Sequence, residues 1–321
     1  MVKIIKSVTK SIGRGIKNDP EISKIVQKYP KFFRFLKKRL TPTEKYGLHF
    51  TLGFLTTLFF IYIFFGILRD YIGHENIIQF DLRVLNLFSA FRHPKLNRQM
   101  LFITYLAKGE IIIIGTLIVS LILFIFQKYH LIKTLLISVL GGEILVWIIK
   151  HLISRPRPPL TDSLVIESSH SFPSGHTFVA LAFYGLLVYF VIQSERRRFL
   201  KIITSLVGLF LIALVSISRI YLGAHWPSDV LASLAAGGAW LVIMATSLKI
   251  KKKFTSSKPN LVQFHPIVAK TTATFLIIVW IAFIFSYYYT HPLAKSPPNQ
   301  PPPTTIITVS YTHLTLPTIY S

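Results

Sequence analysis

Seven long runs of apolar residues constrain this chain more than any other feature of its sequence. Each run is close to the length of about 20 residues that a helix needs to cross the hydrocarbon core of a bilayer. Because a spanning segment must satisfy its backbone hydrogen bonds internally, such runs form helices. They predict transmembrane helices near residues 49–68, 111–127, 131–149, 177–193, 200–217, 229–248 and 268–288.

The long stretch between the first two runs, residues 69–110, predicts a helix that lies on the membrane surface. Its apolar residues recur at helical spacing among charged ones, which is typical of an amphipathic helix. These apolar residues are Phe80, Val84, Leu85, Phe88 and Phe91. The expected fold is therefore an all-α integral membrane protein with a six-helix transmembrane core, an amphipathic surface helix and a seventh, C-terminal transmembrane helix.

The charge of the chain bears on its partners. Its 321 residues carry a formal net charge of +24. In a soluble protein this excess would indicate nucleic acid, but here the cations lie in patches between apolar runs. That placement favours the lipid bilayer as the partner and argues against nucleic-acid binding. Oligomeric state stays open.

The basic patches also predict an orientation. They lie in the N-terminal tail and at residues 127–130, 195–201 and 249–253. If all seven runs span the membrane, these patches share one side, which the positive-inside tendency makes cytoplasmic. The segments expected on the extracytoplasmic side are 69–110, 150–176, 218–228 and the C-terminal tail.

Four segments are expected along the chain: a basic cytoplasmic segment (1–47), a transmembrane core (48–250), a linker with the additional helix (251–290) and a disordered tail (291–321). Residues 1–47 lack the short apolar core of a cleavable signal peptide, and none is expected. Residues 309–321 resemble one reading frame of a sequencing-library adapter and are expected to be an assembly artefact. With no cysteine, disulfide and thiol chemistry are excluded.

Three polar clusters stand at the ends of apolar runs, all on the predicted extracytoplasmic side. They are the segments 150–158, 171–177 and 218–229. In the first, Lys150 follows a hydrophobic helix, so its ammonium can extend outward. Arg157 lies between two prolines, which favours a fixed guanidinium for bidentate contact to phosphate.

The second cluster predicts an anion site at a helix start. Ser174 and Gly175 open the fourth spanning helix, where free N–H groups and the positive end of the helix dipole favour an anion. Gly175 allows close approach of the backbone to a ligand, and Ser174 adds a hydroxyl donor. His176 follows one step inside the helix and is expected to face the same space.

The third cluster places an arginine, a histidine and an aspartate within twelve residues. Pro227 suits the first turn of a helix. This puts His225 just before that helix and Asp229 in its first turn, where the carboxylate can reach the imidazole. Arg219 lies six residues before His225. A cation, an imidazole and an orienting carboxylate are what phosphoryl transfer through histidine requires.

Each residue also has a plainer interpretation. Lys150 and Arg157 could be flanking charges, Ser174 only a helix cap, and His176 a satisfied polar residue. Glu143, an acid inside an apolar run, could be functional or could pair with a neighbouring helix or lysine. The convergence of the three clusters on one membrane face, however, favours a common phosphate site.

The combined pattern resembles the tripartite signature of the type 2 phosphatidic acid phosphatase superfamily, in its integral membrane lipid phosphate phosphatase branch. The matching parts are Lys150-x6-Arg157-Pro158, Pro173-Ser174-Gly175-His176 and Ser218-Arg219-x5-His225-x3-Asp229. The resemblance extends over roughly residues 30–250 and includes Phe80-Asp81 and the Thr104 region, which are similar to the family's surface-helix segment. The seventh helix departs from the usual six-span core.

This resemblance implies a phosphohistidine mechanism. His225 would attack phosphorus, Asp229 would orient its imidazole, and His176 would protonate the leaving alkoxide and then deprotonate water. The groups that would hold the equatorial oxygens are Lys150, Arg157, Ser174, Gly175 and Arg219. With these donors, no metal ion and no other cofactor is expected.

The resemblance and the location together predict a lipid substrate. A phosphate site at helix ends suits a headgroup whose tail stays in the bilayer, such as phosphatidic acid, phosphatidylglycerol phosphate or a polyprenyl diphosphate. The expected location is a bacterial inner or plasma membrane. Two alternatives stay open: a phosphotransferase that passes the phosphate to another acceptor, and a non-catalytic binder or transporter of phosphorylated lipid.

Overall fold

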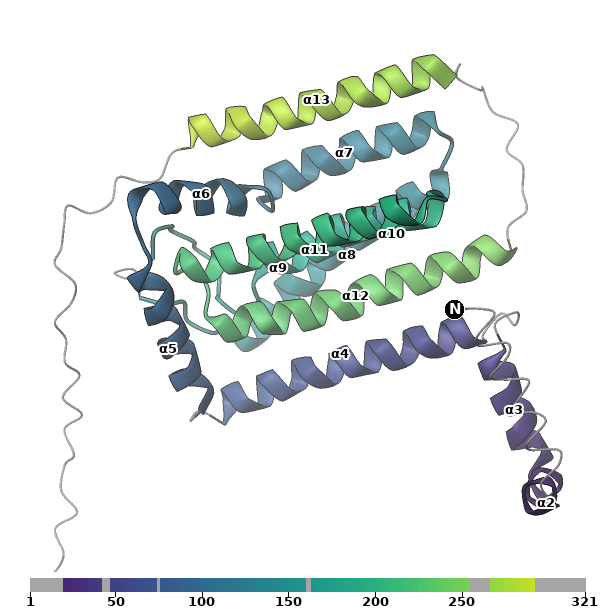
Figure 1. The fold of residues 1–321 in the computed structure, drawn as a ribbon. Coiled ribbons are helices and arrows are strands. Elements are labelled where there is room, and N and C mark those ends of the chain that lie inside the picture. The colour runs from purple at the N-terminus through teal and green to yellow at the C-terminus, as the bar shows by residue number, and fades with distance from the viewer. Residues whose placement is uncertain (1–19, 42–46, 74–75, 160–162, 255–265, 292–321) are drawn as a thin grey trace, which may run out of the picture.

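The computed structural model describes residues 20–41, 47–73, 76–159, 163–254 and 266–291. Within these ranges every regular element is helical, which confirms the all-α prediction. The expected adapter sequence at 309–321 and all but the first residue of the expected tail lie outside the described residues. Figure 1 shows the described helices as a bundle with α2 (Pro20–Lys28) and α3 (Pro30–Leu40) extending from one corner.

Six helical segments are long and apolar enough to cross a membrane. They are α4 (Leu48–Ile72), α8 (Tyr129–Ile153), the continuous helix Gly175–Ser194, α11 (Arg198–Tyr221), α12 (Pro227–Phe254) and α13 (Pro266–Thr290). The continuous helix consists of α9 (Gly175–Ala180), a π-helical turn η2 (Leu181–Gly185) and α10 (Leu186–Ser194). Each agrees in position with a predicted run.

The predicted run at 111–127 is a shorter helix, α7 (Gly109–Ile125), of 17 residues. It follows α6 (Pro94–Tyr105) after a bend of 45°, and only the pair is long enough to span. Residues 69–110 therefore contain a second helix besides the predicted amphipathic one, because Pro94 starts a new helix behind the cap residue His93. The first helix of this region is α5 (Asn76–Ala90).

The apolar residues of the predicted amphipathic helix are partly buried and partly exposed. Leu85 on α5 is buried, whereas Phe80 on α5 and Phe91 just beyond it are 42% and 62% exposed. Asp81 is fully buried instead. A carboxylate is costly to bury unless it is paired, so Asp81 needs partners within the bundle.

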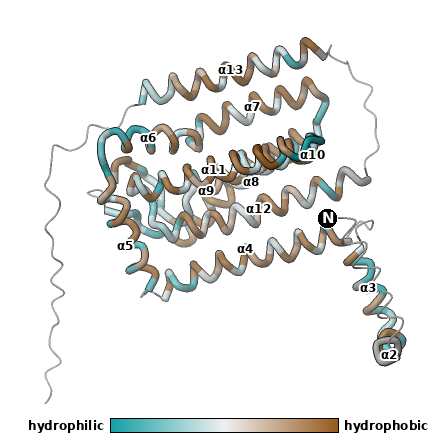
Figure 2. The backbone as a smooth tube through the Cα atoms, viewed as in Figure 1, coloured by the Kyte–Doolittle hydropathy of each residue, from teal (hydrophilic) through white to brown (hydrophobic). Residues whose placement is uncertain are grey.

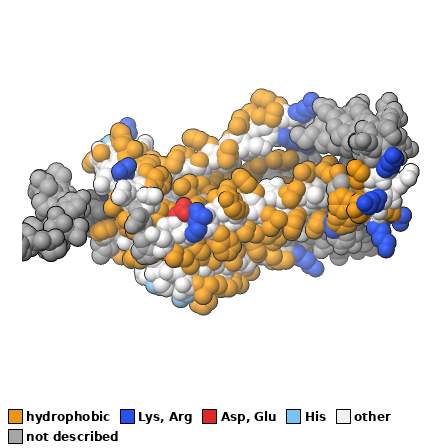
Figure 3. Space-filling model, turned by 90° about the horizontal axis from the view of Figure 1, so that it is seen from below, with side chains coloured by type: hydrophobic (Ala, Val, Ile, Leu, Met, Phe, Trp, Pro, Cys, Tyr) orange, Lys and Arg blue, Asp and Glu red, His pale blue; other side chains and the backbone are white. Residues whose placement is uncertain are grey.

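Loops and helix ends divide into two groups at opposite ends of the bundle (Figure 1). One end holds α5, the described parts of the loop 154–174 (154–159 and 163–174) and the connection from α11 to α12, and is called the site end below. The other end holds α3 (Pro30–Leu40) and the turns near residues 127 and 196. Figure 3 shows one face covered mostly by hydrophobic side chains, with Lys and Arg side chains gathered toward that second end.

The core lies where α8, the continuous helix 175–194, α11 and α12 pack together. Its fully buried members include Leu135, Ala180, Phe183, Leu186 and Val215. Figure 2 shows hydrophobic residues along the length of the helices and hydrophilic ones concentrated toward the helix ends. The outer helices α4 and α13 lie at opposite edges of the bundle and expose apolar side chains, as helices in lipid do (Figure 1).

Small residues bring α4 and α12 into close contact. The Cα of Gly238 faces the ring of Phe60, which an added Cβ would approach to 3.0 Å. Gly53 on α4 faces Thr246, whose Oγ1 an added Cβ would approach to 2.2 Å. Close helix packing through small residues substitutes for the hydrophobic drive that is missing between helices in lipid.

Candidate active site

The three polar clusters of the sequence meet at the site end of the bundle. Residues from the loop 154–174 contact the start of α12 and the residues just before it. The contacts that join them are Arg157 with His225, Ser171 with Asp229 and Arg155 with Asp229. The structure thus brings together segments that lie about 55 to 75 residues apart along the chain.

His225 lies between a guanidinium and a carboxylate. Its Nε2 is 3.2 Å from Nη1 of Arg157, and its Nδ1 is 3.7 Å from Oδ2 of Asp229. The Ser171 hydroxyl is 3.4 Å from Nδ1 and also donates to Asp229. Because the carboxylate side favours a proton on Nδ1, this tautomer leaves a lone pair on Nε2.

The charge state of His225 follows from its surroundings. Burial, together with the nearby cations Arg157 and Arg219, holds the pKa of its imidazole well below the ordinary value of 6.5. The side chain is 1% exposed, so water does not screen these cations. The imidazole is therefore neutral at pH 7, which is the form that can act as a nucleophile.

Asp229 is held firmly in the first turn of α12. Its Oδ2 accepts hydrogen bonds from the Ser171 hydroxyl and from the backbone N–H of Trp226, the latter at 3.0 Å. Its Oδ1 accepts from Arg155 at 2.6 Å. With both oxygens engaged, the carboxylate has a fixed orientation toward His225.

Arg155 is a residue that the sequence reasoning missed. Its side chain is 3% exposed and joins Asp229 to Asp81, whose Oδ2 it contacts at 2.6 Å. Ser228 completes the network, since its backbone N–H and its hydroxyl both donate to Asp81, at 2.8 and 2.5 Å. This buried network of Asp81, Arg155, Ser228 and Asp229 gives the buried acid on α5 its partners.

Arg219 is buried at the end of α11, 1% exposed. Its Nη1 donates to the Thr104 hydroxyl at 2.8 Å, and its Nη2 donates to Glu167 Oε1 at 2.5 Å. Its Nε, which is also buried, has no hydrogen-bond partner within the described part of the chain. One nitrogen of the guanidinium, Nε, therefore has an N–H that is not used by the described residues.

Lys150 and Arg157 point toward the same loop segment. The Lys150 ammonium donates to the carbonyl oxygen of His170. Arg157 donates to the carbonyl of Ser169 at 2.6 Å and to the carbonyl of Ala224 at 2.5 Å. Burial and the neighbouring cation Arg219 lower the pKa of Arg157 to about 10, although the carboxylate of Glu167 opposes this, so the guanidinium stays charged at neutral pH.

The helix start at Ser174 is close to these groups. Ser174 is buried; its N–H lies 3.4 Å from the carbonyl of Asp229, and its hydroxyl accepts from Thr177 at 3.2 Å. A Cβ added at Gly175 would meet only Val146, at 3.8 Å. Packing within the chain therefore does not require glycine at this position.

His176 is partly buried in the first turn of α9 and lies close enough to the carboxylate of Glu167 to interact with it electrostatically. Burial alone would raise the pKa of Glu167, but Arg219 and His176 lower it to about 2. Glu167 is thus ionised at neutral pH, beside two of the residues singled out from the sequence.

Glu143 is not brought to this cluster. It lies in mid-α8 with an exposed side chain, and it makes no hydrogen bond or ion pair with the described residues. No group of three or more metal-ligating side chains occurs among the residues that the structure describes.

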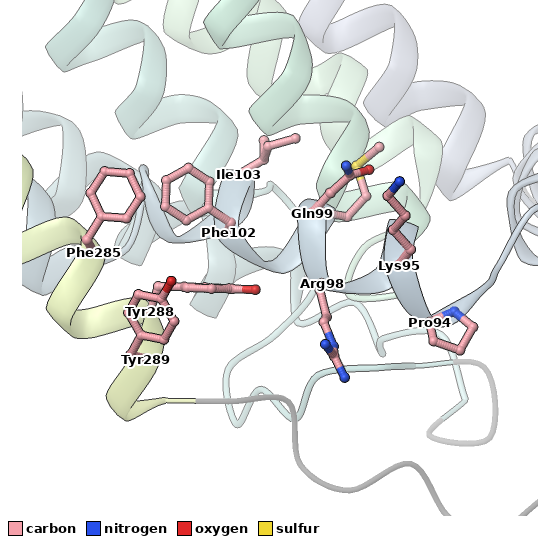
Figure 4. Close-up of a pocket in the computed structure, with 10 residues that line it drawn as sticks. Pro94, Lys95, Arg98, Gln99, Phe102, Ile103, Phe285, Tyr288 and Tyr289 are labelled. Atoms are coloured by element: carbon pink, nitrogen blue, oxygen red, sulfur yellow. The ribbon is translucent and has the colours of Figure 1, made fainter.

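A groove of about 760 Å³ between α6 and α13 also lies apart from the cluster (Figure 4). Its lining includes the aromatic rings of Phe102, Phe285 and Tyr288 and the basic side chains of Lys95 and Arg98.

The sequence of the chain is similar to those of known phosphatases. The family model described as "PAP2 superfamily" matches residues 131–253. Phosphatidylglycerophosphatase B of Bacillus subtilis is 33% identical over 184 residues, which cover 55% of this chain and 87% of that protein. An undecaprenyl-diphosphatase of Sulfolobus acidocaldarius is 26% identical over 198 residues, covering 60% of this chain and 89% of that protein.

A solved structure agrees with the fold. The crystal structure of a transmembrane PAP2-type phosphatidylglycerolphosphate phosphatase from Bacillus subtilis matches with a TM-score of 0.54 and 27% identity. The match covers 64% of this chain and 98% of the other. The helix α13 lies beyond the residues that the family model matches.

Proposed function

The chain belongs to the PAP2 superfamily, and we propose that it hydrolyses the phosphate monoester or diphosphate of a membrane lipid through a phosphohistidine intermediate. The observation that carries the proposal is the position of His225. Its Nε2 faces the Arg157 guanidinium, and its Nδ1 faces a fixed carboxylate. A neutral imidazole with one oriented lone pair beside a phosphate-binding cation is arranged for attack on phosphorus.

In the first step, Nε2 of His225 forms a bond to phosphorus while the bond from phosphorus to the lipid oxygen breaks. The imidazole becomes cationic as it is phosphorylated, and Asp229 stabilises that charge across Nδ1. Asp229 keeps its orientation because Ser171, Trp226 and Arg155 already hold both carboxylate oxygens.

His176 supplies the proton for the leaving alkoxide or phosphate. Having lost that proton, it can take one from water, whose oxygen then attacks phosphorus. The bond to Nε2 breaks, His225 returns to its neutral form, and inorganic phosphate leaves. The position of His176 in the first turn of α9, beside Glu167, supports this assignment.

Five groups would hold the equatorial oxygens. They are the side chains of Lys150, Arg157, Arg219 and Ser174 and the N–H of Gly175. The unused Nε of Arg219 supports a role in binding an anion, because a buried donor without a partner is costly. The open space beside Gly175 supports close approach of a phosphate oxygen to the backbone.

The substrate class follows from where the site lies. The cluster is at the ends of the apolar helices, where a headgroup can reach it while the lipid tail remains in the bilayer. The relatives are a phosphatidylglycerophosphatase and an undecaprenyl-diphosphatase, which supports both monoester and diphosphate lipids as candidates. The basic opposite end supports an extracytoplasmic site and a cytoplasmic N-terminal segment.

The decisive experiment measures phosphate release by the purified protein from phosphatidic acid, phosphatidylglycerol phosphate and a polyprenyl diphosphate in 18O-labelled water. We expect release from at least one of these lipids, with the label in the phosphate. His225→Ala serves as the negative control. Transfer of unlabelled phosphate to an alcohol would identify a phosphotransferase, and absence of release from all three lipids would contradict the proposal.

A further inference from the structure

One internal segment, residues 167–171, engages all three cations proposed to hold the substrate phosphate. Its contacts are Lys150 with the carbonyl of His170, Arg157 with the carbonyl of Ser169, and Arg219 with the carboxylate of Glu167. The segment therefore occupies donors that a phosphoryl group would need. Only one of these contacts is made by a charged group of the segment, the carboxylate of Glu167.

Glu167 matches a phosphate oxygen in charge and position. Its Oε1 accepts a charge-assisted hydrogen bond from Nη2 of Arg219, at 2.5 Å. Arg219 and His176 lower the pKa of Glu167 to about 2, although burial opposes this. The carboxylate is therefore an anion throughout the pH range in which an enzyme works.

The guanidinium of Arg219 is incompletely satisfied by Glu167. Nη1 donates to Thr104 and Nη2 donates to Glu167, while the buried Nε has no partner within the described residues. A phosphate can accept from Nε and Nη2 together, the bidentate contact that guanidinium groups favour. Glu167 makes only one of these two bonds. It therefore occupies part of the position that a phosphate would take and leaves Nε without a partner.

The side chain of Glu167 is also partly exposed to solvent. Its side chain is 22% exposed, whereas that of Arg219 is 1% exposed. The carboxylate can therefore turn toward water when a phosphoryl group arrives, while the guanidinium stays in place. An exchange of anions at a fixed cation needs no large movement of the helices.

We propose that Glu167 is an internal competitor of phosphate at Arg219. Its carboxylate holds the guanidinium in the empty site, yields to the substrate's phosphoryl group, and returns to promote the departure of inorganic phosphate. The inference rests on the proposed function for the identity of the anion. It assigns to Glu167 a role in limiting product inhibition that is separate from the chemical steps.

The test compares Glu167→Gln with the unaltered protein for binding of inorganic phosphate and orthovanadate, by isothermal titration calorimetry in detergent. Without the competing carboxylate, we expect both anions to bind about tenfold more tightly, the change for one charge-assisted hydrogen bond of competition. Inhibition of lipid hydrolysis by phosphate should strengthen by the same factor.

Glu110→Gln is the matched control. It removes the same charge at the site end, from the exposed first turn of α7, and Glu110 makes no hydrogen bond or ion pair with the described residues. Its effect on anion binding measures the general change in electrostatic potential. The inference requires that Glu167→Gln tighten anion binding by more than Glu110→Gln does.

Unchanged or weaker anion binding in Glu167→Gln would overturn the inference and would make Glu167 a support for Arg219. If that variant unfolds at a lower temperature than the parent, Glu167→Asp replaces it, and its shorter carboxylate should give intermediate tightening. Failure of the proposed function is a separate result. In that case anion binding tightens as expected, while neither the parent nor the Glu110→Gln control releases phosphate from any lipid.

Discussion

At the scale of single residues, the site depends on a histidine that is kept neutral among cations. Arg157 and Arg219 disfavour protonation of His225, and burial removes the water that would screen them. The carboxylate of Asp229 favours protonation of His225, but this carboxylate also accepts hydrogen bonds from Arg155 and Ser171. The imidazole of His225 can therefore keep the lone pair that the proposed attack on phosphorus requires.

The titration of His225 tests this balance. In protein with 13C-labelled histidine, the signal assigned by its loss in His225→Asn should titrate below pH 6.5. The unfolded chain binds this proton more tightly than the folded one, so the contribution of His225 to stability falls as the pH drops below about 6.5. A midpoint above 6.5 would show that Asp229 dominates over the two arginines.

The two histidines should respond differently to the leaving group. His225→Ala should abolish turnover of both a lipid phosphate and p-nitrophenyl phosphate. His176→Asn should lower turnover of the lipid by about 10²–10⁴-fold, the usual contribution of a general acid. It should slow the first step much less with p-nitrophenyl phosphate, whose leaving group needs no proton. Burst kinetics measure that step, and equal losses with both substrates would contradict the assignment of His176.

Removal of Arg155 should be costly for stability. Arg155→Gln leaves the carboxylates of Asp81 and Asp229 buried without their cation, which typically costs about 3–5 kcal/mol. The control is Arg69→Gln, which breaks an exposed pair with Asp70 and should cost at most about 1 kcal/mol. Unfolding in detergent by increasing denaturant measures both. A similar small loss in the two variants would mean that the network adds little to stability.

The same residue shows where sequence reasoning ends. The spacing Lys-x6-Arg-Pro singles out Arg157, and the structure brings that residue to His225. Arg155 stands two positions earlier in the same polar segment and carries no local signal of burial. Its role depends on Asp81, which is 74 residues away in the chain and on the helix α5. Only tertiary contact reveals that pairing.

At the scale of elements, the spanning helices were predictable because a bilayer demands long apolar runs. The region 69–110 was not, since its two helices are short and their packing decides which face is buried. Pro94 could have been recognised as a helix start, which would have separated α5 from α6. The inward position of Asp81 contradicts the apolar periodicity, so it could not have been found from that pattern.

Two glycines on α4 offer a matched test of helix packing. A Cβ at Gly53 would lie 2.2 Å from Thr246 Oγ1, whereas a Cβ at Gly66 would meet nothing within 4 Å. We expect Gly53→Leu to destabilise the contact of α4 with α12 by about 1–3 kcal/mol, the usual cost of overpacking. Gly66→Leu should be close to neutral. Unfolding midpoints in detergent compare them, and equal effects would show that α4 shifts freely against α12.

At the scale of the whole molecule, charge and chemistry are separated along the bundle axis. The loops that carry the site residues lie at one end, and many of the described cations that take no part in the site lie at the other (Figures 1 and 3). From the positive-inside tendency we propose that the basic end is cytoplasmic. A lipid phosphatase of this orientation would act on headgroups of the outer leaflet.

This orientation is directly measurable because the chain has no cysteine. Ile166→Cys places one thiol at the site end, where the side chain is 83% exposed, and Arg196→Cys places one in the exposed turn at the opposite end. With a membrane-impermeant maleimide on intact cells, Ile166→Cys should label at once and Arg196→Cys only after lysis, because the bilayer blocks the reagent. The reverse pattern would place the site in the cytoplasm and make inner-leaflet lipids its substrates.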